Sequence, residues 1–419
     1  MPGPSRTEVL VVGAGPTGLL AALQLVQRGL RVEVIEEEWR PAGHSYALAL
    51  HPRSLERLAE VGLAEETIAA GRRLETLTLL EGEQPRARLP LAPEARFPFV
   101  LALPQSALEG LLARRLEAQG VAIQWSHRLA GLEPRGDGVV ARVQRLEKVS
   151  TGYAVAHTEW AIARVLELEA SFVIGADGHG SLVRRALGVR FDEAGPSQVF
   201  AVLECDAGSP SDGLRLLLGD GKTSVLWPLP GGRARWNLEL EAPEVAASER
   251  HKSRLTTQLG EHFFHHLDEP AVTALLRQRA PWFASEPYEL GWSAEVRFER
   301  RLAASFGAGR VWLAGDAAHL TGPAGMQSMN AGLDEASDLA ARFDWIRAGR
   351  AGLDVLADYG RARTAEWRFL LGRAGRLHPG PDAPAFVARH ADQLLSSLPA
   401  TAAELDGLAG RLGLVAERG

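Results

Sequence analysis

A glycine-rich turn near the start of the chain constrains the fold more than any other feature of the sequence. The turn, Gly13-Ala-Gly-Pro-Thr-Gly18, follows the short apolar run Glu8 to Val12 and opens a leucine- and alanine-rich segment, Pro16 to Arg28. In a strand–turn–helix unit, the first glycine permits the tight turn, the second lets the backbone approach a pyrophosphate, and the third lets the helix pack against the sheet. The helix N-terminus also offers N–H groups to phosphate. We therefore expect a parallel sheet and a dinucleotide site formed by Gly13, Gly15, Pro16, Thr17 and Gly18.

An acidic residue closes the next predicted strand. Gly29 ends the helix as a C-terminal cap would, and Arg31 to Glu36 has the β-branched residues of a strand. A carboxylate at the end of such a strand meets a ribose 2′-hydroxyl of a bound dinucleotide, which makes Glu36 a binding candidate. A glycine motif alone is a weak signal, and its ordinary interpretation is a turn in a βαβ unit. The strand before it, the helix after it and the acid together favour dinucleotide binding.

The composition is that of an ordinary globular protein. The chain has 419 residues, 46% hydrophobic and 23% charged, which excludes a disordered or fibrous chain and allows about two or three domains. The net charge of −6 argues against a nucleic-acid partner, because such a groove needs a basic surplus. Cys205 is the only cysteine, so no disulfide or thiolate metal cluster forms within the chain, and a cytoplasmic location is expected. We expect neither a signal peptide nor a membrane span of about 18 apolar residues.

The pattern of elements changes along the chain and predicts two domains and a tail. Between about Gly188 and Trp292, short runs such as Thr223 to Trp227 resemble antiparallel strands joined by proline and glycine turns. Two helices are strongly predicted, one from Ser106 to Gln119 with Ser106 as its cap and one from about Asn330 to Arg347. We expect an α/β fold, α+β overall: a Rossmann-like domain (1–73, 100–187 and 293–350), an inserted antiparallel-sheet domain (74–99 and 188–292) and a helical C-terminal tail (351–419).

Two further segments place an aspartate beside glycines at the end of a predicted strand. One is Gly175-Ala-Asp-Gly178, after Phe172-Val-Ile174, and the other is Gly315-Asp316. A carboxylate in this position can accept hydrogen bonds from sugar or polyol hydroxyls. After the second segment, a loop at Gly325 precedes a helix and can aim backbone N–H groups at an electron-rich ring. Each segment alone could be a turn with a capping aspartate.

Together, in this order and spacing, the three segments resemble the single-component FAD-dependent aromatic hydroxylases, the p-hydroxybenzoate-hydroxylase-like group of flavoprotein monooxygenases. The resemblance covers most of Val9 to about Arg363 and is loose between Gly188 and Trp292. It implies FAD as cofactor, NAD(P)H as reductant, molecular oxygen as co-substrate and a small aromatic substrate. The implied reaction is hydroxylation of an aromatic or polycyclic compound, natural products included, through a C4a-hydroperoxyflavin.

The resemblance implies roles at the adenosine side of the cofactor. The glycine turn would hold the FAD pyrophosphate and Glu36 the adenosine ribose. Leu129 would make a main-chain contact near the adenine. Asp177 belongs to a motif that serves both FAD and NAD(P)H binding in the family.

The resemblance also implies roles at the flavin side. Asp316 would bind the ribityl chain, and Gln105 matches a position near the flavin. The segment Gly325 to Asn330, which includes Met329, would face the pyrimidine end of the ring. Two departures stand out: Gly43-His-Ser-Tyr46 replaces a loop that often carries an arginine, and Ser328 stands where glycine is usual.

Catalytic and substrate residues follow less directly from the sequence. The family's chemistry needs little from side chains beyond shielding, orientation and a base that favours a phenolate. Candidate bases are His44, Tyr46, His51 and Tyr288, although a structural role is favoured for each one alone. Candidate pocket residues are Trp227, Trp236 and Pro323, and the two tryptophans could equally be core residues. His319 is expected to position the Gly315-Asp316 loop.

Several alternatives stay open. A flavin enzyme of the same fold could be an epoxidase, a Baeyer–Villiger enzyme, a halogenase or an oxygen-independent reductase, or the chain could carry flavin without turnover. A halogenase would need a lysine in the first part of the chain, and none precedes Lys148. His262 and His266 could chelate a metal from one helix face, but a solvated helix face is favoured and no metal site is predicted. The tail could serve packing or a homodimer contact.

Overall fold

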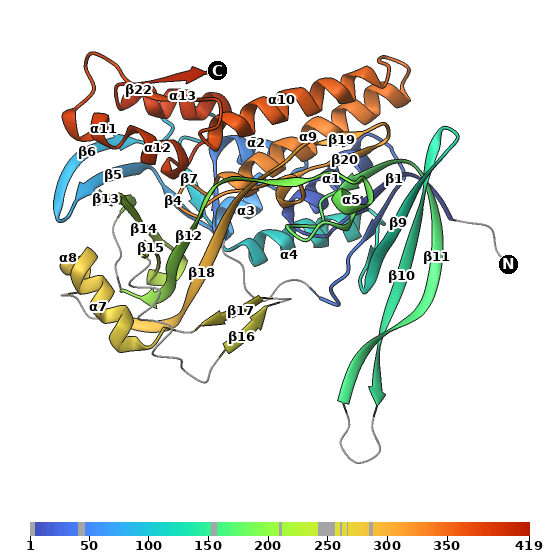
Figure 1. The fold of residues 1–419 in the computed structure, drawn as a ribbon, viewed down its shortest axis with the longest axis horizontal. Coiled ribbons are helices and arrows are strands. Elements are labelled where there is room, and N and C mark those ends of the chain that lie inside the picture. The colour runs from blue at the N-terminus through green and yellow to red at the C-terminus, as the bar shows by residue number, and fades with distance from the viewer. Residues whose placement is uncertain are drawn as a thin grey trace.

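The structure, a computed structural model, describes residues 5–40, 47–151, 157–208, 212–241, 256–259, 262–265, 267–284 and 288–419. Two large sheets and the helices packed on them form most of this part of the chain (Figure 1). The predicted α/β fold is confirmed.

The first sheet has a parallel core. Its order is β19-β20-β11-β1-β2-β8, and β20, β11, β1, β2 and β8 run parallel to one another, whereas β19 is antiparallel to β20. The strands are β1 (Ser5–Val12), β2 (Val32–Ile35), β8 (Ile123–Gln124), β11 (His157–Gly175), β19 (Gly307–Ala308) and β20 (Val311–Leu313). Helix α1 (Pro16–Gln27) connects β1 to β2, as the glycine turn predicts, and α9 (Gln327–Arg347) packs against it.

An antiparallel meander extends this sheet. It consists of β9 (His127–Arg135), β10 (Gly138–Thr151) and β11. The distal parts of β10 and β11 project from the body as a two-stranded arm (Figure 1). Strands β10 and β11 are thus long and paired along most of their length.

The second sheet is largely antiparallel, in the order β16-β17-β18-β12-β15-β14-β13-β5-β6, with β21 beside β18. Its strands are β5 (Thr76–Glu81), β6 (Gln84–Pro90), β12 (Phe191–Asp206), β13 (Leu214–Gly219), β14 (Lys222–Pro228), β15 (Arg233–Glu239), β16 (Thr256–Leu259), β17 (His262–His265), β18 (Glu289–Ala303) and β21 (His319–Leu320). Helices α7 (Glu269–Arg279) and α8 (Pro281–Ala284) contribute Val272, Leu276 and Phe283 to the core under one face of this sheet.

Shorter elements complete the fold. A small sheet joins β3 (Ala49–Leu50), β7 (Val100–Ala102) and β4 (Arg72–Leu74). The remaining helices near the first sheet are α2 (Pro52–Glu60), α3 (Ala64–Ala70), α4 (Gln105–Ala118), α5 (Leu182–Ala186) and α10 (Asp354–Leu370). The C-terminal region adds β22 (Gly375–Pro379), α11 (Ala385–Arg389), α12 (Ala391–Ser397), α13 (Ala402–Arg411) and β23 (Leu414–Arg418).

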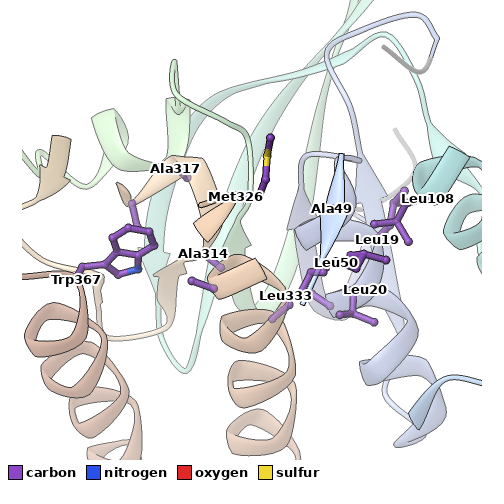
Figure 2. Close-up of a cluster of buried hydrophobic side chains, with 14 of the residues drawn as sticks. Leu19, Leu20, Ala49, Leu50, Leu108, Ala314, Ala317, Met326, Leu333 and Trp367 are labelled. Atoms are coloured by element: carbon purple, nitrogen blue, oxygen red, sulfur yellow. The ribbon is translucent and has the colours of Figure 1, made fainter. Parts of the chain in front are cut away.

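The main core lies between the first sheet and the helices. Leu19 and Leu20 of α1, Leu50 of β3 and Leu333 of α9 belong to one buried cluster (Figure 2). Such close helix packing needs small residues, and a Cβ at Gly332 would lie 2.6 Å from Thr17 Oγ1. The third glycine of the turn also permits close packing, because a Cβ at Gly18 would lie 2.1 Å from the carbonyl oxygen of Gly13.

Some expected elements differ from the observed ones. Helix α4 begins at Gln105 after Pro104, so Ser106 is not its cap, and the first residue of α9 is Gln327 rather than Asn330. The tail is not purely helical, because β22 and β23 pair in it. The segment His262–His265 is a strand, not a helix, and His266 lies outside the described residues. The proposed boundary at residue 293 falls inside β18.

Candidate active site

The glycine turn has the shape needed to admit a phosphate group. Gly13 has a φ of +107°, and a Cβ there would lie 2.2 Å from the carbonyl oxygen of Ala176. Among the described residues, a Cβ at Gly15 would meet nothing within 4 Å, so this part of the chain leaves the space in front of the α1 N-terminus open at this position. Pro16 begins α1, where its missing N–H removes no intrahelical hydrogen bond. The turn is therefore sterically closed behind Gly13 and open in front of Gly15.

Glu36 lies directly against the turn. Its Oε2 accepts a hydrogen bond from the Ala14 amide at 2.7 Å, and its Oε1 accepts one from the Glu38 amide at 2.9 Å. Burial raises the pKa of this carboxyl. Strand β9 adjoins it, since the His127 amide donates to the Glu36 carbonyl at 2.8 Å, and Leu129 is buried two residues further along β9.

Glu109 lies near Glu36 and was not among the predicted site residues. Gln105 donates its Nε2–H to Glu109 Oε1 at 2.7 Å. Burial raises the pKa of Glu109 to about 7, and the negative charge of Glu36 contributes. Glu109 stands three residues after Ser106, which is the spacing of a capping box, so its local pattern indicates helix capping rather than a binding site.

Asp177 is used by the chain itself. Its Oδ1 accepts a hydrogen bond from Ser181 Oγ at 2.6 Å, and its Oδ2 accepts from the amides of Leu182 and Val183 at 2.7 and 3.0 Å. Burial raises the pKa of Asp177. The structure thus shows the capping alternative for this aspartate, at the start of α5.

The three glycine–acid segments converge at the start of α1. The Ala176 amide, beside Asp177, donates to the Val12 carbonyl at 2.8 Å, which joins the second segment to the first. A Cβ at Gly315 would lie 2.8 Å from Thr17 Oγ1, which brings the third segment onto the first turn of α1. Arg184 links the second and third segments, because its Nη1 donates to the Ala317 carbonyl at 2.7 Å.

Asp316 differs from the other two acids in being exposed. It lies in a short 3-10 turn, Gly315–Ala317, and accepts a hydrogen bond from Ser328 Oγ at 2.6 Å. Its carboxylate can therefore meet a ligand hydroxyl from the solvent side. His319, expected to position this loop, is buried at the end of it and contacts Glu335, a residue that the sequence did not single out.

The segment from Gly325 to Asn330 is held from two sides. Asn330 Oδ1 accepts hydrogen bonds from the His51 amide and from Ser54 Oγ, both at 2.7 Å, and its Nδ2 donates to the carbonyls of Ala49 and Met326. On the other side, a Cβ at Gly325 would lie 2.6 Å from the carbonyl oxygen of Leu398 in the tail. Met326 adopts a left-handed φ of +52°, which sequence reasoning did not anticipate, and Met329 is half-buried.

The candidate bases that the structure describes, His51 and Tyr288, lie in different surroundings. His51 is fully buried, its Nε2 lies 3.0 Å from the Gly325 carbonyl oxygen, and burial lowers its pKa to about 4. It therefore holds the loop as a neutral ring. The Tyr288 hydroxyl lies 2.8 Å from Thr273 Oγ1 of α7, so it belongs to the helix-covered side of the second sheet. His44 and Tyr46 lie outside the described residues.

The two tryptophan candidates lie on opposite faces of the second sheet. Trp227 pairs with Arg235 and Leu226 pairs with Trp236, and directly paired residues share a face while neighbours along a strand alternate. Trp236 packs against Trp282 and Phe283 beneath α8, with ring centroids 6.0 and 5.3 Å away. Trp227 instead joins the core that includes α1 and α9, and its buried Nε1 has no hydrogen-bond partner.

Pro323 is buried at the junction of the two sheets, next to polar residues that the sequence did not indicate. A Cβ on the preceding Gly322 would lie 2.6 Å from Gln198 Oε1. Gln198 Nε2 donates to Glu239 Oε1 at 2.8 Å, and the Thr223 amide donates to Glu239 Oε2 at 2.8 Å. The amide of Gln198 is thereby oriented with its oxygen toward Gly322.

Other possible sites are distinct from this one. A groove of about 630 Å³ lies between α10 and β19–β20 and is lined by Phe306 and Trp312, among others. It includes no residue of the three glycine–acid segments. Within the described ranges, no cluster of three or more His, Cys, Asp or Glu could hold a metal ion. Nor does any helix of the described chain have the length and apolar character to cross a membrane.

Comparison with known proteins identifies relatives. The chain is 33% identical over 365 residues to 6-methylpretetramide 4-monooxygenase from Streptomyces rimosus, an alignment that covers 85% of this chain and 59% of that protein. It is 27% identical over 387 residues to pentachlorophenol 4-monooxygenase from Sphingobium chlorophenolicum, covering 90% and 65%. This chain thus spans less than two thirds of the length of these curated relatives.

Solved structures share the fold. The p-nitrophenol 4-monooxygenase from Pseudomonas putida DLL-E4 superimposes with a TM-score of 0.70 at 22% identity, covering 98% of this chain and 94% of that one. Aklavinone-11 hydroxylase, solved with FAD and aklavinone, superimposes with a TM-score of 0.68 at 23% identity, covering 95% and 70%. The profile of the FAD binding domain family matches residues 6–371, and the chain belongs to this family.

Proposed function

We propose that the chain is an FAD-dependent, NAD(P)H-driven monooxygenase that hydroxylates an aromatic or polycyclic compound. The observation that carries the proposal is the convergence of three distant glycine–acid segments on the first turn of α1. Such a convergence fits one extended cofactor with phosphates at its centre and polyol groups on either side. Family membership supports FAD as that cofactor.

The residues present fit FAD. The open space at Gly15 and the N-terminus of α1 would take the pyrophosphate, and Glu36 would take the adenosine ribose. Asp316 is exposed and free to accept a further hydrogen bond on Oδ2, which suits a ribityl hydroxyl. Asp177, whose oxygens are occupied by α5, would act by shaping the turn rather than by direct binding.

Bound FAD would supply the redox chemistry, accepting reducing equivalents from NAD(P)H and activating molecular oxygen. The chain would orient the reactants and exclude water. Helix α9 presents its N-terminus beside Asp316, where its positive end can stabilise negative charge. Trp227 and Pro323, both buried, would support the substrate side from the core behind it, with Gln198 offering a hydrogen-bond acceptor for a substrate hydroxyl.

The relatives' names guide the choice of substrate. They include monooxygenases named for 6-methylpretetramide and for pentachlorophenol, that is, a polycyclic and a monocyclic phenol-type compound. We therefore propose a phenolic or fused-ring aromatic substrate.

A spectrum and a turnover assay test the proposal. The purified protein should be yellow and release FAD on denaturation, and a suitable phenolic compound should stimulate NAD(P)H oxidation with oxygen uptake and a hydroxylated product. A protein that does not bind added FAD would contradict the proposal. NAD(P)H oxidation without oxygen consumption would instead point to a reductase of the same fold.

We also propose that the chain forms a homodimer, and the arm supports this. Trp160, Ile162 and Val165 lie on one face of β11 and are 47%, 51% and 53% exposed. The Lys148 ammonium lies on the same face, 4.2 Å from the ring centroid of Trp39, which is itself exposed. Exposed apolar patches of this kind mark interaction surfaces.

Light scattering on a sizing column tests the dimer. Ile162→Lys should shift a dimer to a monomer, because it places a charge in the apolar face. Val415→Lys is the matched control, since Val415 is 60% exposed on β23, away from the arm. A wild-type monomer, or a dimer that survives Ile162→Lys, would contradict an interface on the arm.

A further inference from the structure

We infer that Ser328 is a positioning residue for Asp316, and that a buried pair formed by Glu335 and His319 holds Ser328 in place. The inference deepens the proposed function and rests on it, because it assumes that Asp316 meets the FAD ribityl chain. It concerns how this particular chain prepares that carboxylate before the cofactor binds.

The first link is the contact between Ser328 and Asp316. The serine hydroxyl donates to Asp316 Oδ1 at 2.6 Å, a short hydrogen bond to a charged acceptor. An exposed carboxylate on a short turn has several rotamers available, and this bond selects one of them. It leaves Oδ2 as the oxygen available to a ligand.

The second link is His319. Its Nδ1 lies 3.3 Å from Ser328 Oγ, and its Nε2 lies 2.9 Å from Glu335 Oε2. Both His319 and Glu335 are fully buried. The ring therefore spans the gap between the buried Glu335 carboxylate and the Ser328 hydroxyl, and the hydroxyl donates to Asp316.

The third link anchors this series of contacts in the core. Glu335 Oε2 also accepts from the Gly315 amide at 2.8 Å, and Glu335 Oε1 accepts from Trp367 Nε1 at 2.9 Å. The Trp367 ring stacks on His319 with centroids 3.7 Å apart and an interplanar angle of 17°. Glu335 therefore holds both ends of the turn that carries Asp316, through Gly315 before it and His319 after it. A buried carboxylate with three donors is satisfied and rigid.

A simple structural role for Ser328 is not what the geometry shows. Ser328 lies in the first turn of α9 and does not cap it, because the N-cap is Met326 and makes no side-chain cap hydrogen bond. The Ser328 hydroxyl is therefore available for the link from His319 to Asp316.

A double-mutant cycle on FAD affinity tests the inference. The dissociation constant for FAD would be measured by flavin fluorescence on apo-protein for wild type, Ser328→Ala, Asp316→Asn and the double variant. Ser328→Ala should weaken binding by about tenfold, the effect of losing one hydrogen bond to a charged group. In the Asp316→Asn background, Ser328→Ala should change the constant by less than about twofold, because the two residues act as one unit.

Controls separate positioning from folding. Ser328→Thr keeps the hydroxyl and should retain near wild-type affinity. Ser337→Ala removes a buried hydroxyl without a hydrogen-bond partner from the same helix and should leave FAD affinity unchanged. Melting temperatures of the apo-proteins should be alike for Ser328→Ala and Ser328→Thr.

Glu335→Gln tests the buried anchor. In Glu335→Gln protein that remains folded, adding Ser328→Ala should change the FAD dissociation constant much less than it does in the wild-type background. Unchanged affinity in Ser328→Ala, or an equal loss with and without Asp316, would overturn the inference while leaving the proposed function intact. A wild-type protein that binds no FAD would instead overturn the proposed function.

Discussion

Three acidic residues of this site have similar sequence surroundings but different hydrogen-bond partners and exposure. Glu36, Asp177 and Asp316 all follow strands of the first sheet, yet only Asp316 is exposed, and the other two are half-buried. Both carboxylate oxygens of Asp177 accept hydrogen bonds from residues at the start of α5, and both oxygens of Glu36 accept hydrogen bonds from backbone amides. Burial and neighbouring donors, not residue type, decide how much of each carboxylate is left for a ligand.

The same substitution should affect different properties at two glycines of the turn: stability at Gly13 and FAD binding at Gly15. Gly13→Ala should lower the free energy of unfolding by a few kcal/mol, roughly 2 to 4, because its φ is +107° and a Cβ would lie 2.2 Å from the Ala176 carbonyl oxygen. Gly15→Ala should leave the melting temperature of the apo-protein nearly unchanged and weaken FAD binding, because its Cβ would fill only the open phosphate space. Denaturation curves and FAD titrations check both. A Gly15→Ala variant with full FAD affinity would contradict the placement of the phosphate.

At the scale of elements, helices are positioned by a few buried polar contacts as well as by apolar packing. Helix α4 carries Glu109 into the core near Glu36, and α13 carries Glu404, which accepts a hydrogen bond from the Arg53 amide at 2.7 Å. Burial raises the pKa of each carboxyl to about 7. These two helices are therefore docked through acids that resist ionisation.

The stability of the protein should depend on pH through these two acids. Their pKa values are higher in the folded chain than in the unfolded chain, so between about pH 4.5 and 7 the unfolded chain releases protons that the folded chain keeps. The free energy of unfolding should fall as pH rises through this window, by at most about 3 kcal/mol per group. Glu109→Gln should flatten the profile, and Glu117→Gln, on the exposed face of α4, should not. Urea denaturation at pH 5 and pH 8 measures both.

Gln327, the first residue of α9, holds the C-terminal tail against this helix. This buried side chain donates its Nε2–H to the carbonyls of Leu395, Leu398 and Ala400, at 2.8, 3.4 and 3.3 Å. Gln327→Ala should release this segment, lower the melting temperature by several degrees and expose the tail to protease, because all three carbonyls lose the hydrogen bond from this side chain. Limited proteolysis with mass spectrometry checks the site of cleavage. Gln119→Ala, at the exposed end of α4, is the control, and equal protection of both variants would contradict the role of Gln327.

At the scale of the whole molecule, the second sheet divides its two faces between different tasks. One face is covered by α7 and α8, and the other joins the core that includes α1 and α9. Trp227 and Trp236 are neighbours across adjacent strands, but the pleat sends them to opposite faces. Only the face that carries Trp227 is turned to the FAD-binding part of the chain.

Matched tryptophan variants test this division. Trp227→Phe should raise the KM for the aromatic substrate several-fold with little change in FAD affinity, because its ring belongs to the core that adjoins the site. Trp236→Phe should lower stability by roughly 1 to 3 kcal/mol and leave KM unchanged, because its ring packs under α8. Steady-state kinetics and denaturation on both variants give the comparison. Equal effects of the two substitutions on KM would contradict the assignment of faces.

The sequence by itself determined the local features of this protein. The glycine turn, the strand–helix–strand unit after it and the acid at Glu36 follow from steric and hydrogen-bonding rules that act over a few residues, and the structure has them. The resemblance to FAD-dependent hydroxylases rested on the same short motifs, and the family match confirmed it.

Only the tertiary structure decided how these pieces are used. His262–His265 pairs as a strand although its local pattern favoured a helix, because neighbouring strands supply its hydrogen bonds. The face of each tryptophan depends on strand register, and the bond from Ser328 to Asp316 depends on a buried Glu335 that no motif marks. Burial and register are set by contacts between segments far apart along the chain, so local pattern does not contain them.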